Sequence, residues 1–200
     1  KSNSYDVTGD VPGSVYSALL NNKLTEDPYY RDNEAKTLRI TDEDFTFERK
    51  FDYGGDFVLP ELVCEGIDTI SEIFINGKLL AKTNDMHRTY RFDVRDFLKN
   101  GENDIKIVFP SYDKFIKKKH AGKPITVGTG ATMLGFSYVR KASYMSGWDW
   151  GPMLPDAGIW KDIYIIDNAA PRITDFKVSQ RYTDGKVFIT VEAETNVKAE

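Results

Sequence analysis

Short segments in which apolar and polar residues alternate recur along the chain, and this period of two is typical of half-buried β-strands. Phe45, Phe47 and Phe51 alternate with polar side chains, and the run 103–109 alternates in the same way. Alternation places the apolar side chains on one face of a strand and the polar ones on the other. The pattern predicts strands at residues 45–51, 57–64, 70–75, 78–80, 88–94, 103–109 and 160–166.

The connections between these segments favour antiparallel pairing. Asn76-Gly77 lies between two apolar runs, and this dipeptide is a strong hairpin signal because a type I′ turn needs positive φ at both positions. A two-turn helix is expected within residues 11–20, and residues 23–33 are expected to be loop. A parallel α/β fold would need amphipathic helices of about ten or more residues between strands, which the pattern lacks. The sequence therefore predicts an all-β fold, a β-sandwich.

The alternating pattern stops at 168–171, Asn-Ala-Ala-Pro, and then restarts. Residues 173–179 and 187–193 read as two strands around an Asp184-Gly185 turn. We expect one domain at residues 1–168 and the first strands of a second β domain at 169–200. Two strands alone are only marginally stable in water.

Composition excludes several classes of partner. The chain of 200 residues has 27 basic and 31 acidic side chains, a net charge of -4, which gives no electrostatic signature for nucleic acid or an anionic membrane. No apolar run is long enough for a membrane span, and the N-terminus lacks the apolar stretch of a signal peptide. The compartment is left unassigned, since the chain does not start with methionine. The single cysteine, Cys64, is expected to be a buried small hydrophobe.

All three tryptophans lie between residues 148 and 160, in a stretch broken by glycines and prolines. Such a stretch is too interrupted for a helix and indicates a shaped loop. Trp148, Asp149 and Trp150 suit a sugar, because indole faces pack on the C–H face of a pyranose and a carboxylate accepts hydrogen bonds from adjacent hydroxyls. The alternative is structural: Trp150 and Trp160 as core aromatics, and Asp149 as a turn cap.

Other residues have weaker signals. In an extended segment Trp148 and Trp150 would point to opposite sides, so that one faces the sugar and the other the core. Arg140 and Lys141 are expected to pair with nearby acids and hold the loop. His87, beside Arg88, favours a structural hydrogen bond.

The basic cluster at residues 117–120, which contains His120, is expected to be a solvated helix end. No cofactor and no structural zinc are predicted, since the two histidines are far apart and cysteines are not clustered. A calcium site is left open.

Seven motifs occur in order along the chain, at residues 11–16 (Val-Pro-Gly-Ser-Val-Tyr), 27–34 (Asp-Pro-Tyr-Tyr-Arg-Asp-Asn-Glu), 47–51, 62–69, 74–78, 86–90 and 140–160. Together they resemble the N-terminal part of β-mannosidases of glycoside hydrolase family 2. The Gly-Trp-Asp-Trp-Gly-Pro element is characteristic of that branch, whereas Phe-Ile-Asn-Gly-Lys and Gly-Ile-Trp are also similar to β-galactosidases and β-glucuronidases.

The resemblance implies a jelly-roll, galactose-binding-like domain, then an immunoglobulin-like domain, then a (β/α)₈ barrel that carries the catalytic carboxylates. No catalytic residue is therefore expected in residues 1–200, and this chain alone is expected to be inactive. The resemblance implies that Trp148 and Asp149 bind the non-reducing mannose of a β-mannoside, with Trp150 less defined, where the loop meets the barrel. The alternatives are a β-galactosidase or β-glucuronidase, a carbohydrate-binding module, or a purely structural domain.

Overall fold

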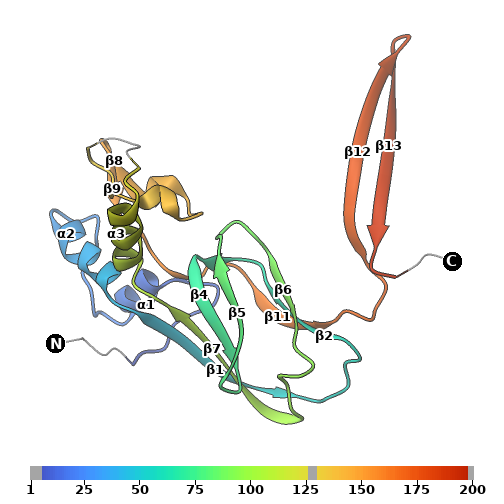
Figure 1. Ribbon diagram of the computed structural model, residues 1–200, viewed down its shortest axis with the longest axis horizontal. Coiled ribbons are helices and arrows are strands. Elements are labelled where there is room, and N and C mark those ends of the chain that lie inside the picture. Colours follow the sequence, from blue (N-terminus) through green and yellow to red (C-terminus); the bar gives the residue numbers. More distant parts are fainter. Residues whose placement is uncertain (1–5, 126–129, 198–200) are drawn as a thin grey trace.

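The computed structural model describes residues 6–125 and 130–197, and its main body consists of antiparallel sheets packed face to face (Figure 1). The larger sheet comprises, in spatial order, β1 (Phe45–Tyr53), β7 (Gly101–Phe109), β4 (Ile70–Ile75) and β5 (Lys78–Asn84). The sheet opposite comprises β11 (Ile163–Asp167), β2 (Pro60–Cys64) and β6 (Tyr90–Asp93), and beside it β3 (Ile67–Asp68) pairs with β10 (Gly158–Ile159). The prediction of an all-β sandwich is confirmed.

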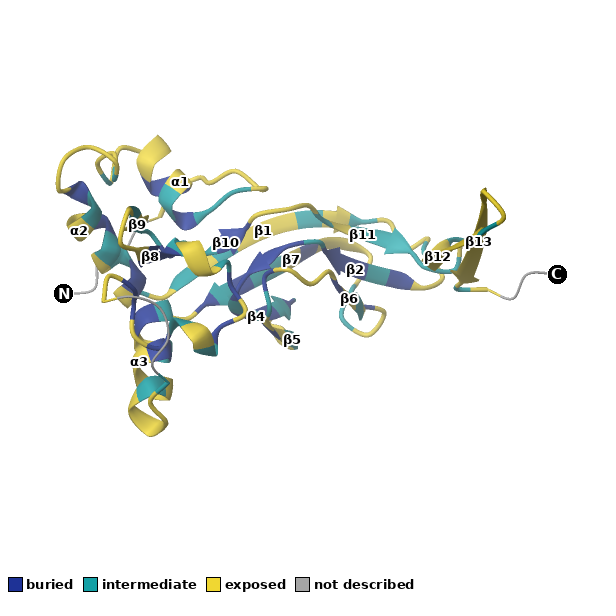
Figure 2. Ribbon diagram, turned by 90° about the horizontal axis from the view of Figure 1, so that it is seen from above, coloured by how far each residue is buried: buried dark blue, intermediate teal, exposed yellow. Residues whose placement is uncertain are grey.

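The core lies between the two sheets, where the alternating side chains meet. β1 and β7 pair without a register shift from Phe45 opposite Phe109 to Tyr53 opposite Gly101. Figure 2 shows the buried positions concentrated along the strands of the sandwich. Cys64 is fully buried among aliphatic side chains, as predicted. The buried core consists of Leu62, Cys64, Ile67, Ile73, Ile75, Tyr90, Val94, Ile107, Phe109 and Ile159.

The hairpin of β4 and β5 turns at Asn76-Gly77, as the sequence predicts. Asn76 has φ 49° and Gly77 has φ 75°, the left-handed conformations that a type I′ turn requires. The Asn76 side chain also donates to the Asn103 side chain over 2.7 Å. The turn is thereby fixed to β7.

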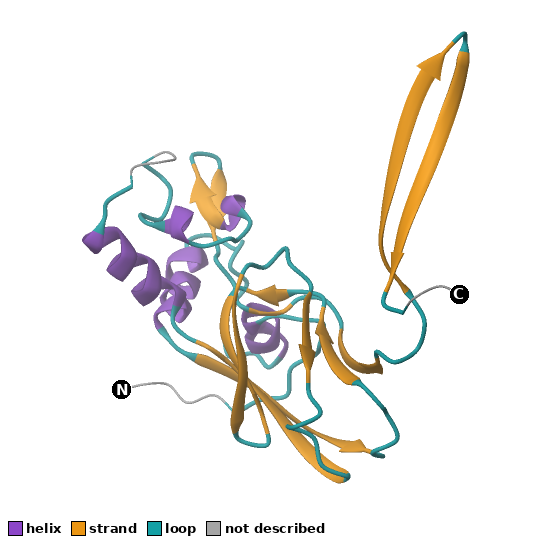
Figure 3. Cartoon of the chain, turned by 45° about the vertical axis from the view of Figure 1, so that its right-hand side comes forward, coloured by secondary structure: helices purple, strands orange, loops and turns teal. Residues whose placement is uncertain are grey.

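The helices gather at one end of the sandwich, around the segment that contains the tryptophans (Figures 1 and 3). The first helix, α1, is the predicted one, and Ser14 forms a capping box at its N-terminus. Within the described residues, no helix is long and apolar enough to span a bilayer. The helices are α1 (Val15–Asn21), α2 (Asn33–Leu38) and α3 (Tyr112–Gly122), with short 3₁₀ helices η1 (Arg39–Asp42), η2 (Phe136–Tyr138) and η3 (Ser143–Met145).

The loop expected at 23–33 is present as far as Asp32, and α2 begins at Asn33. One local expectation was wrong. His120 lies on α3 but is not solvated, since it is partly buried and its Nδ1 is enclosed with no hydrogen-bond partner in the described structure. The side chain packs where α3 meets Gly135.

A long two-stranded ribbon, β12 (Ile173–Thr183) and β13 (Lys186–Thr195), projects from the opposite end of the domain (Figure 1). Its turn is Asp184-Gly185, as expected. One face carries cross-strand pairs such as Val178 with Val191, whereas the other carries pairs such as Lys177 with Glu192. Both faces are exposed along nearly the whole ribbon.

Candidate functional site

The central feature of the candidate site is a short hairpin, here called the tryptophan hairpin, formed by β8 (Ser146–Trp148) and β9 (Gly151–Met153). Trp148 pairs with Gly151, so Asp149 and Trp150 form its tip. Gly147 has φ 95°, and a Cβ there would lie 2.5 Å from the Ala131 carbonyl oxygen. Glycine is therefore required where the hairpin crosses that backbone.

The two tryptophans of the hairpin lie together. The ring centroids of Trp148 and Trp150 are 5.5 Å apart, with the planes at 66° in an edge-to-face contact. The expectation that they point to opposite sides was wrong, because it assumed an extended chain where the backbone instead reverses between Trp148 and Gly151. The structure thus places a pair of indoles beside one carboxylate.

The tip is exposed. Trp150 is 83% exposed and Trp148 39% exposed, and Asp149 is also exposed. The burial that a purely structural role predicts for Trp148 and Asp149 is not found in the described part of the chain. Trp160 is exposed to a similar extent, at 38%, so it is not the core aromatic that the structural alternative expects. Its indole N–H donates to the Met86 carbonyl over 3.1 Å, away from the tip.

Polar contacts from two helices hold the strands of the tryptophan hairpin in place. The Glu34 carboxylate, from α2, accepts a hydrogen bond from the Met153 backbone N–H at 2.7 Å. The hydroxyls of Tyr112 and Ser146 are 3.0 Å apart and hydrogen-bonded. Burial raises the pKa of Tyr112 to about 12. Two different helices therefore fix the two strands of the hairpin.

A buried ion pair anchors the segment that leads into the hairpin. Lys141 pairs with Asp68 in the sandwich, and its ammonium also donates to the Asp156 carbonyl over 2.6 Å. Burial lowers the pKa of Lys141, and the nearby Asp68 carboxylate opposes that shift. Arg140 pairs with Asp85, with 3.5 Å between Nε and Oδ2. The prediction that Arg140 and Lys141 pair with acids is confirmed.

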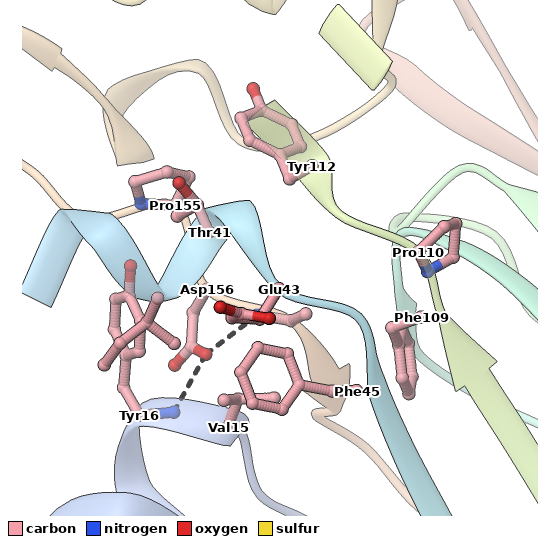
Figure 4. A pocket seen from close by; sticks show the side chains of 12 residues that line it. Val15, Tyr16, Thr41, Glu43, Phe45, Phe109, Pro110, Tyr112, Pro155 and Asp156 are labelled. Carbon is pink, nitrogen blue, oxygen red and sulfur yellow. Dashed lines mark hydrogen bonds between the residues drawn. The ribbon is translucent and has the colours of Figure 1, made fainter. Parts of the chain in front are cut away.

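The segment that leaves the hairpin is tied to α1, as Figure 4 shows. The Asp156 carboxylate accepts from the backbone N–H of Tyr16 at 3.1 Å and of Ala157 at 2.8 Å. Burial raises the pKa of Asp156, while these hydrogen bonds oppose the shift. Burial also raises the pKa of Tyr16. The cavity in Figure 4 measures about 20 Å³, which is room for about one water molecule and too small for a sugar.

A larger, open cleft of about 880 Å³ lies beside the tryptophan hairpin. This volume is in the range of ligand-binding clefts, roughly 300–1,000 Å³. Two exposed tyrosines, Tyr29 and Tyr144, join Trp148 and Trp150 in lining it. The exposed indoles thus face a cleft large enough for a saccharide or for part of another domain.

The remaining predicted residues lie apart from the tip. His87 is exposed, and its backbone N–H donates to the Asp85 carboxylate over 2.9 Å. The Arg88 guanidinium lies 5.4 Å from the centre of the Tyr90 ring. Across residues 6–125 and 130–197, no three His, Cys, Asp or Glu side chains are grouped so that they could hold a metal ion.

Sequence reasoning assigned no role to three residues that shape the site, namely Glu34, Tyr112 and Asp156. Glu34 is the last residue of the motif at 27–34, so the motif drew attention to this position. A motif does not, however, identify the backbone group that hydrogen-bonds to the carboxylate, which is the Met153 N–H. The partner of Tyr112 is likewise distant in sequence. These contacts emerge only from the folded chain.

Comparisons with known proteins point to one family. Residues 1–161 match the family model described as glycosyl hydrolase 2 galactose-binding domain-like. The chain is 35% identical over 174 residues to β-mannosidase of Bos taurus, covering 81% of this chain and 20% of that protein. It is 31% identical over 202 residues to a probable β-mannosidase of Caenorhabditis elegans, covering 94% of this chain and 22% of that protein.

A solved structure agrees. The crystal structure of β-D-mannosidase from Dictyoglomus thermophilum superposes with a TM-score of 0.86 and 32% sequence identity, over 94% of this chain and 23% of that chain. This chain thus spans about a fifth of the length of the curated relatives it matches.

Proposed function

Because the chain belongs to the glycosyl hydrolase 2 galactose-binding-like domain family, as its motifs indicate, we propose that it is the N-terminal accessory domain of a longer, exo-acting β-mannosidase. That enzyme would hydrolyse terminal β-D-mannose residues with retention. The single observation that carries the proposal is the tip of the tryptophan hairpin, where an exposed carboxylate stands beside two exposed indoles.

In this proposal Trp148, Asp149 and Trp150 bind the non-reducing mannose. The Asp149 carboxylate accepts hydrogen bonds from hydroxyls remote from the anomeric carbon, and such charge-assisted bonds are about twice as strong as neutral ones. An indole face covers the C–H face of the pyranose. Binding energy made away from the reacting carbon offsets the cost of orienting and distorting the ring in the transition state.

The chemical step takes place outside this chain. Retaining hydrolysis needs two carboxyl groups about 5 Å apart, one as acid and base and the other as nucleophile. We assign both to a catalytic (β/α)₈ barrel in the longer protein and none to residues 1–200. The chain by itself is accordingly inactive in this proposal, and it needs no cofactor.

The barrel would meet this domain at the tryptophan hairpin and the neighbouring cleft. Exposed aromatic side chains around a cleft of about 880 Å³ support this placement, since apolar surface of this kind marks interaction or ligand sites. The tip would then project over the substrate pocket of the barrel. The partners are a β-mannoside and the barrel of the same chain, with no nucleic acid and no membrane.

Residues 169–200 are proposed to begin an immunoglobulin-like domain. The ribbon β12–β13 has one apolar face, which includes Val178, Val191 and Ile189, and this face is exposed. A two-stranded ribbon gains stability only when such a face is covered by further strands. The boundary falls at 168/169, before Pro171.

The experiment that tests this function is hydrolysis of aryl β-glycosides by the longer protein, with the mannoside compared against the galactoside, glucoside and glucuronide. A clear preference for the mannoside is expected, expressed as kcat/KM. Preference for the galactoside or glucuronide would replace the mannosidase assignment with a sister activity of the family and leave the fold assignment intact.

A matched titration separates an accessory role from an independent carbohydrate-binding module. Mannose, which has no glycosidic bond to hydrolyse, is titrated by calorimetry into the 200-residue chain and into the longer protein. Heat is expected only with the longer protein, because half of a subsite buries too little of the ligand. Equal binding by the isolated chain would favour a binding module instead.

A further inference from the structure

We infer that Glu34 is a positioning residue, which holds the tryptophan hairpin in the orientation that presents Asp149 and Trp148 to substrate. This inference rests on the proposed function and extends it to the motif at 27–34, to which that function assigns no role. Glu34 is far from the tip in sequence and touches the hairpin through one backbone group, the Met153 N–H.

The motif folds into a compact turn that aims α2 at the hairpin. The Asp27 carboxylate accepts from the Tyr29 backbone N–H at 2.9 Å, and the Asn33 side-chain amide donates to the Asp27 carbonyl over 3.0 Å. Asn33 is 6% exposed. Because Asn33 is the first residue of α2, fixing it sets where Glu34 points.

Glu34 meets β9 at its open edge. In the described structure the tryptophan hairpin is a sheet of two strands, with β8 paired to β9 and no further strand beside them. An unpaired edge exposes backbone donors that need partners. The Glu34 carboxylate supplies one, over 2.7 Å, and a hydrogen bond to a charged acceptor is stronger than a neutral one.

The position of the hydrogen bond between Glu34 and Met153 determines which part of the hairpin it holds. Met153 lies two residues beyond Gly151, the partner of Trp148 across the turn. Displacing β9 therefore moves the tip, including Asp149. The tip itself is exposed, so its position follows that of the two strands. A misplacement of about 1 Å at a substrate-positioning element can lower the rate about a hundredfold.

The test uses the longer enzyme and three variants. Glu34→Ala removes the acceptor. Glu34→Gln keeps an amide oxygen that can accept from the Met153 N–H. Glu26→Ala is the matched control, because it deletes the same side chain from an exposed ion pair with Lys36, also on α2. Each is assayed for kcat and KM with an aryl β-mannoside.

We expect Glu34→Ala to lower kcat/KM about 10- to 100-fold, mainly through kcat. Glu34→Gln should stay within about threefold of the parent, and Glu26→Ala within about twofold, since exposed pairs contribute little. The inference is overturned if Glu34→Ala leaves kcat/KM unchanged, or if Glu34→Gln lowers kcat/KM as much as Glu34→Ala does.

A double-mutant cycle with Asp149→Asn distinguishes positioning from general destabilisation. If Glu34 acts through the tip, Glu34→Ala should cost much less in the Asp149→Asn background, because coupled residues are not additive. A loss of equal size in both backgrounds contradicts the inference.

Hydrogen exchange separates a failure of the inference from a failure of the proposed function. In Glu34→Ala, the amides of Met153 and its neighbours Gly151 and Leu154 should exchange faster than in Glu34→Gln, with the sandwich unchanged. If Asp149→Asn alone leaves activity intact, the proposed substrate role fails, and this exchange result still decides whether Glu34 holds the hairpin. Unchanged exchange at Gly151, Met153 and Leu154 overturns the inference.

Discussion

The tryptophan hairpin and the ribbon β12–β13 are both two-stranded, but the hairpin is exposed mainly at its tip and the ribbon along nearly its whole length. They are also held in different ways. The tryptophan hairpin has three residues per strand and is held by Glu34, Tyr112 and the Lys141 segment. The ribbon has ten or eleven residues per strand, and the described contacts that tie it to the domain lie at its base. There the Asn196 side chain donates to the carbonyls of Asn168 and Ala170.

The difference shows that the length of the paired strands does not determine how strongly a hairpin is anchored to the rest of the chain. An isolated hairpin is only marginally stable in water, so its position depends on its contacts with the rest of the chain. The short hairpin receives polar anchors from three separate segments, which suits the substrate-binding role proposed for Asp149. The long ribbon presents an apolar face that further strands would cover.

The largest expected effect comes from breaking the buried anchor of the short hairpin. Lys141→Met leaves Asp68 charged and unpaired in the interior, which costs about 3–5 kcal/mol. Chemical denaturation of the 200-residue chain measures it. Lys36→Met, in an exposed pair with Glu26, is the control and should cost less than about 1 kcal/mol. Equal losses in the two variants would remove the distinction between buried and surface anchors.

A smaller effect is expected from alkaline pH acting on Tyr112, beneath the same hairpin. Its pKa is raised by burial to about 12. The protonated Tyr112 hydroxyl therefore contributes fully to folding stability below pH 10, and this contribution is lost as pH rises toward 12. The loss amounts to about 2–3 kcal/mol for a shift of this size. Unfolding midpoints from pH 8 to 11 should fall less steeply in Tyr112→Phe than in the parent, and parallel curves would contradict this.

The smallest effect is expected at the base of the ribbon. Asn196→Ala removes the hydrogen bonds to Asn168 and Ala170, worth about 1–2 kcal/mol of local opening. Proteolysis at residues 168–172 should accelerate, while global unfolding stays unchanged. Ser179→Ala, on the ribbon itself, is the control. A fall in global stability as large as that of Lys141→Met would mean that the ribbon is part of the cooperative core.

The strands of the sandwich could be predicted from sequence because alternation and turn chemistry are local signals. Asn76-Gly77 and Asp184-Gly185 both turn where expected, each with positive φ. The tip of the tryptophan hairpin has no such signature, since neither Asp149 nor Trp150 has positive φ. Without a turn signal, the sequence predicts an extended segment with the two indoles on opposite sides.

The chemical character of the candidate site could be read from Trp148, Asp149 and Trp150, but its supports could not. Glu34 and Met153 lie on different elements, and their contact depends on how α2 packs against the hairpin. Lys141 was expected to pair with an acid, yet only the fold identifies Asp68 and its burial. Long-range polar contacts of this kind depend on tertiary geometry and leave no periodic pattern.

The most direct test of the account is the activity of Asp149→Asn in the longer enzyme toward an aryl β-mannoside. The substitution keeps the shape of the side chain and removes the charge that, in the proposed role, strengthens hydrogen bonds to the sugar hydroxyls. We predict a loss in kcat/KM of about a hundredfold or more, roughly 2.7 kcal/mol of transition-state stabilisation. A near-parental kcat/KM would contradict the substrate role of the tryptophan hairpin.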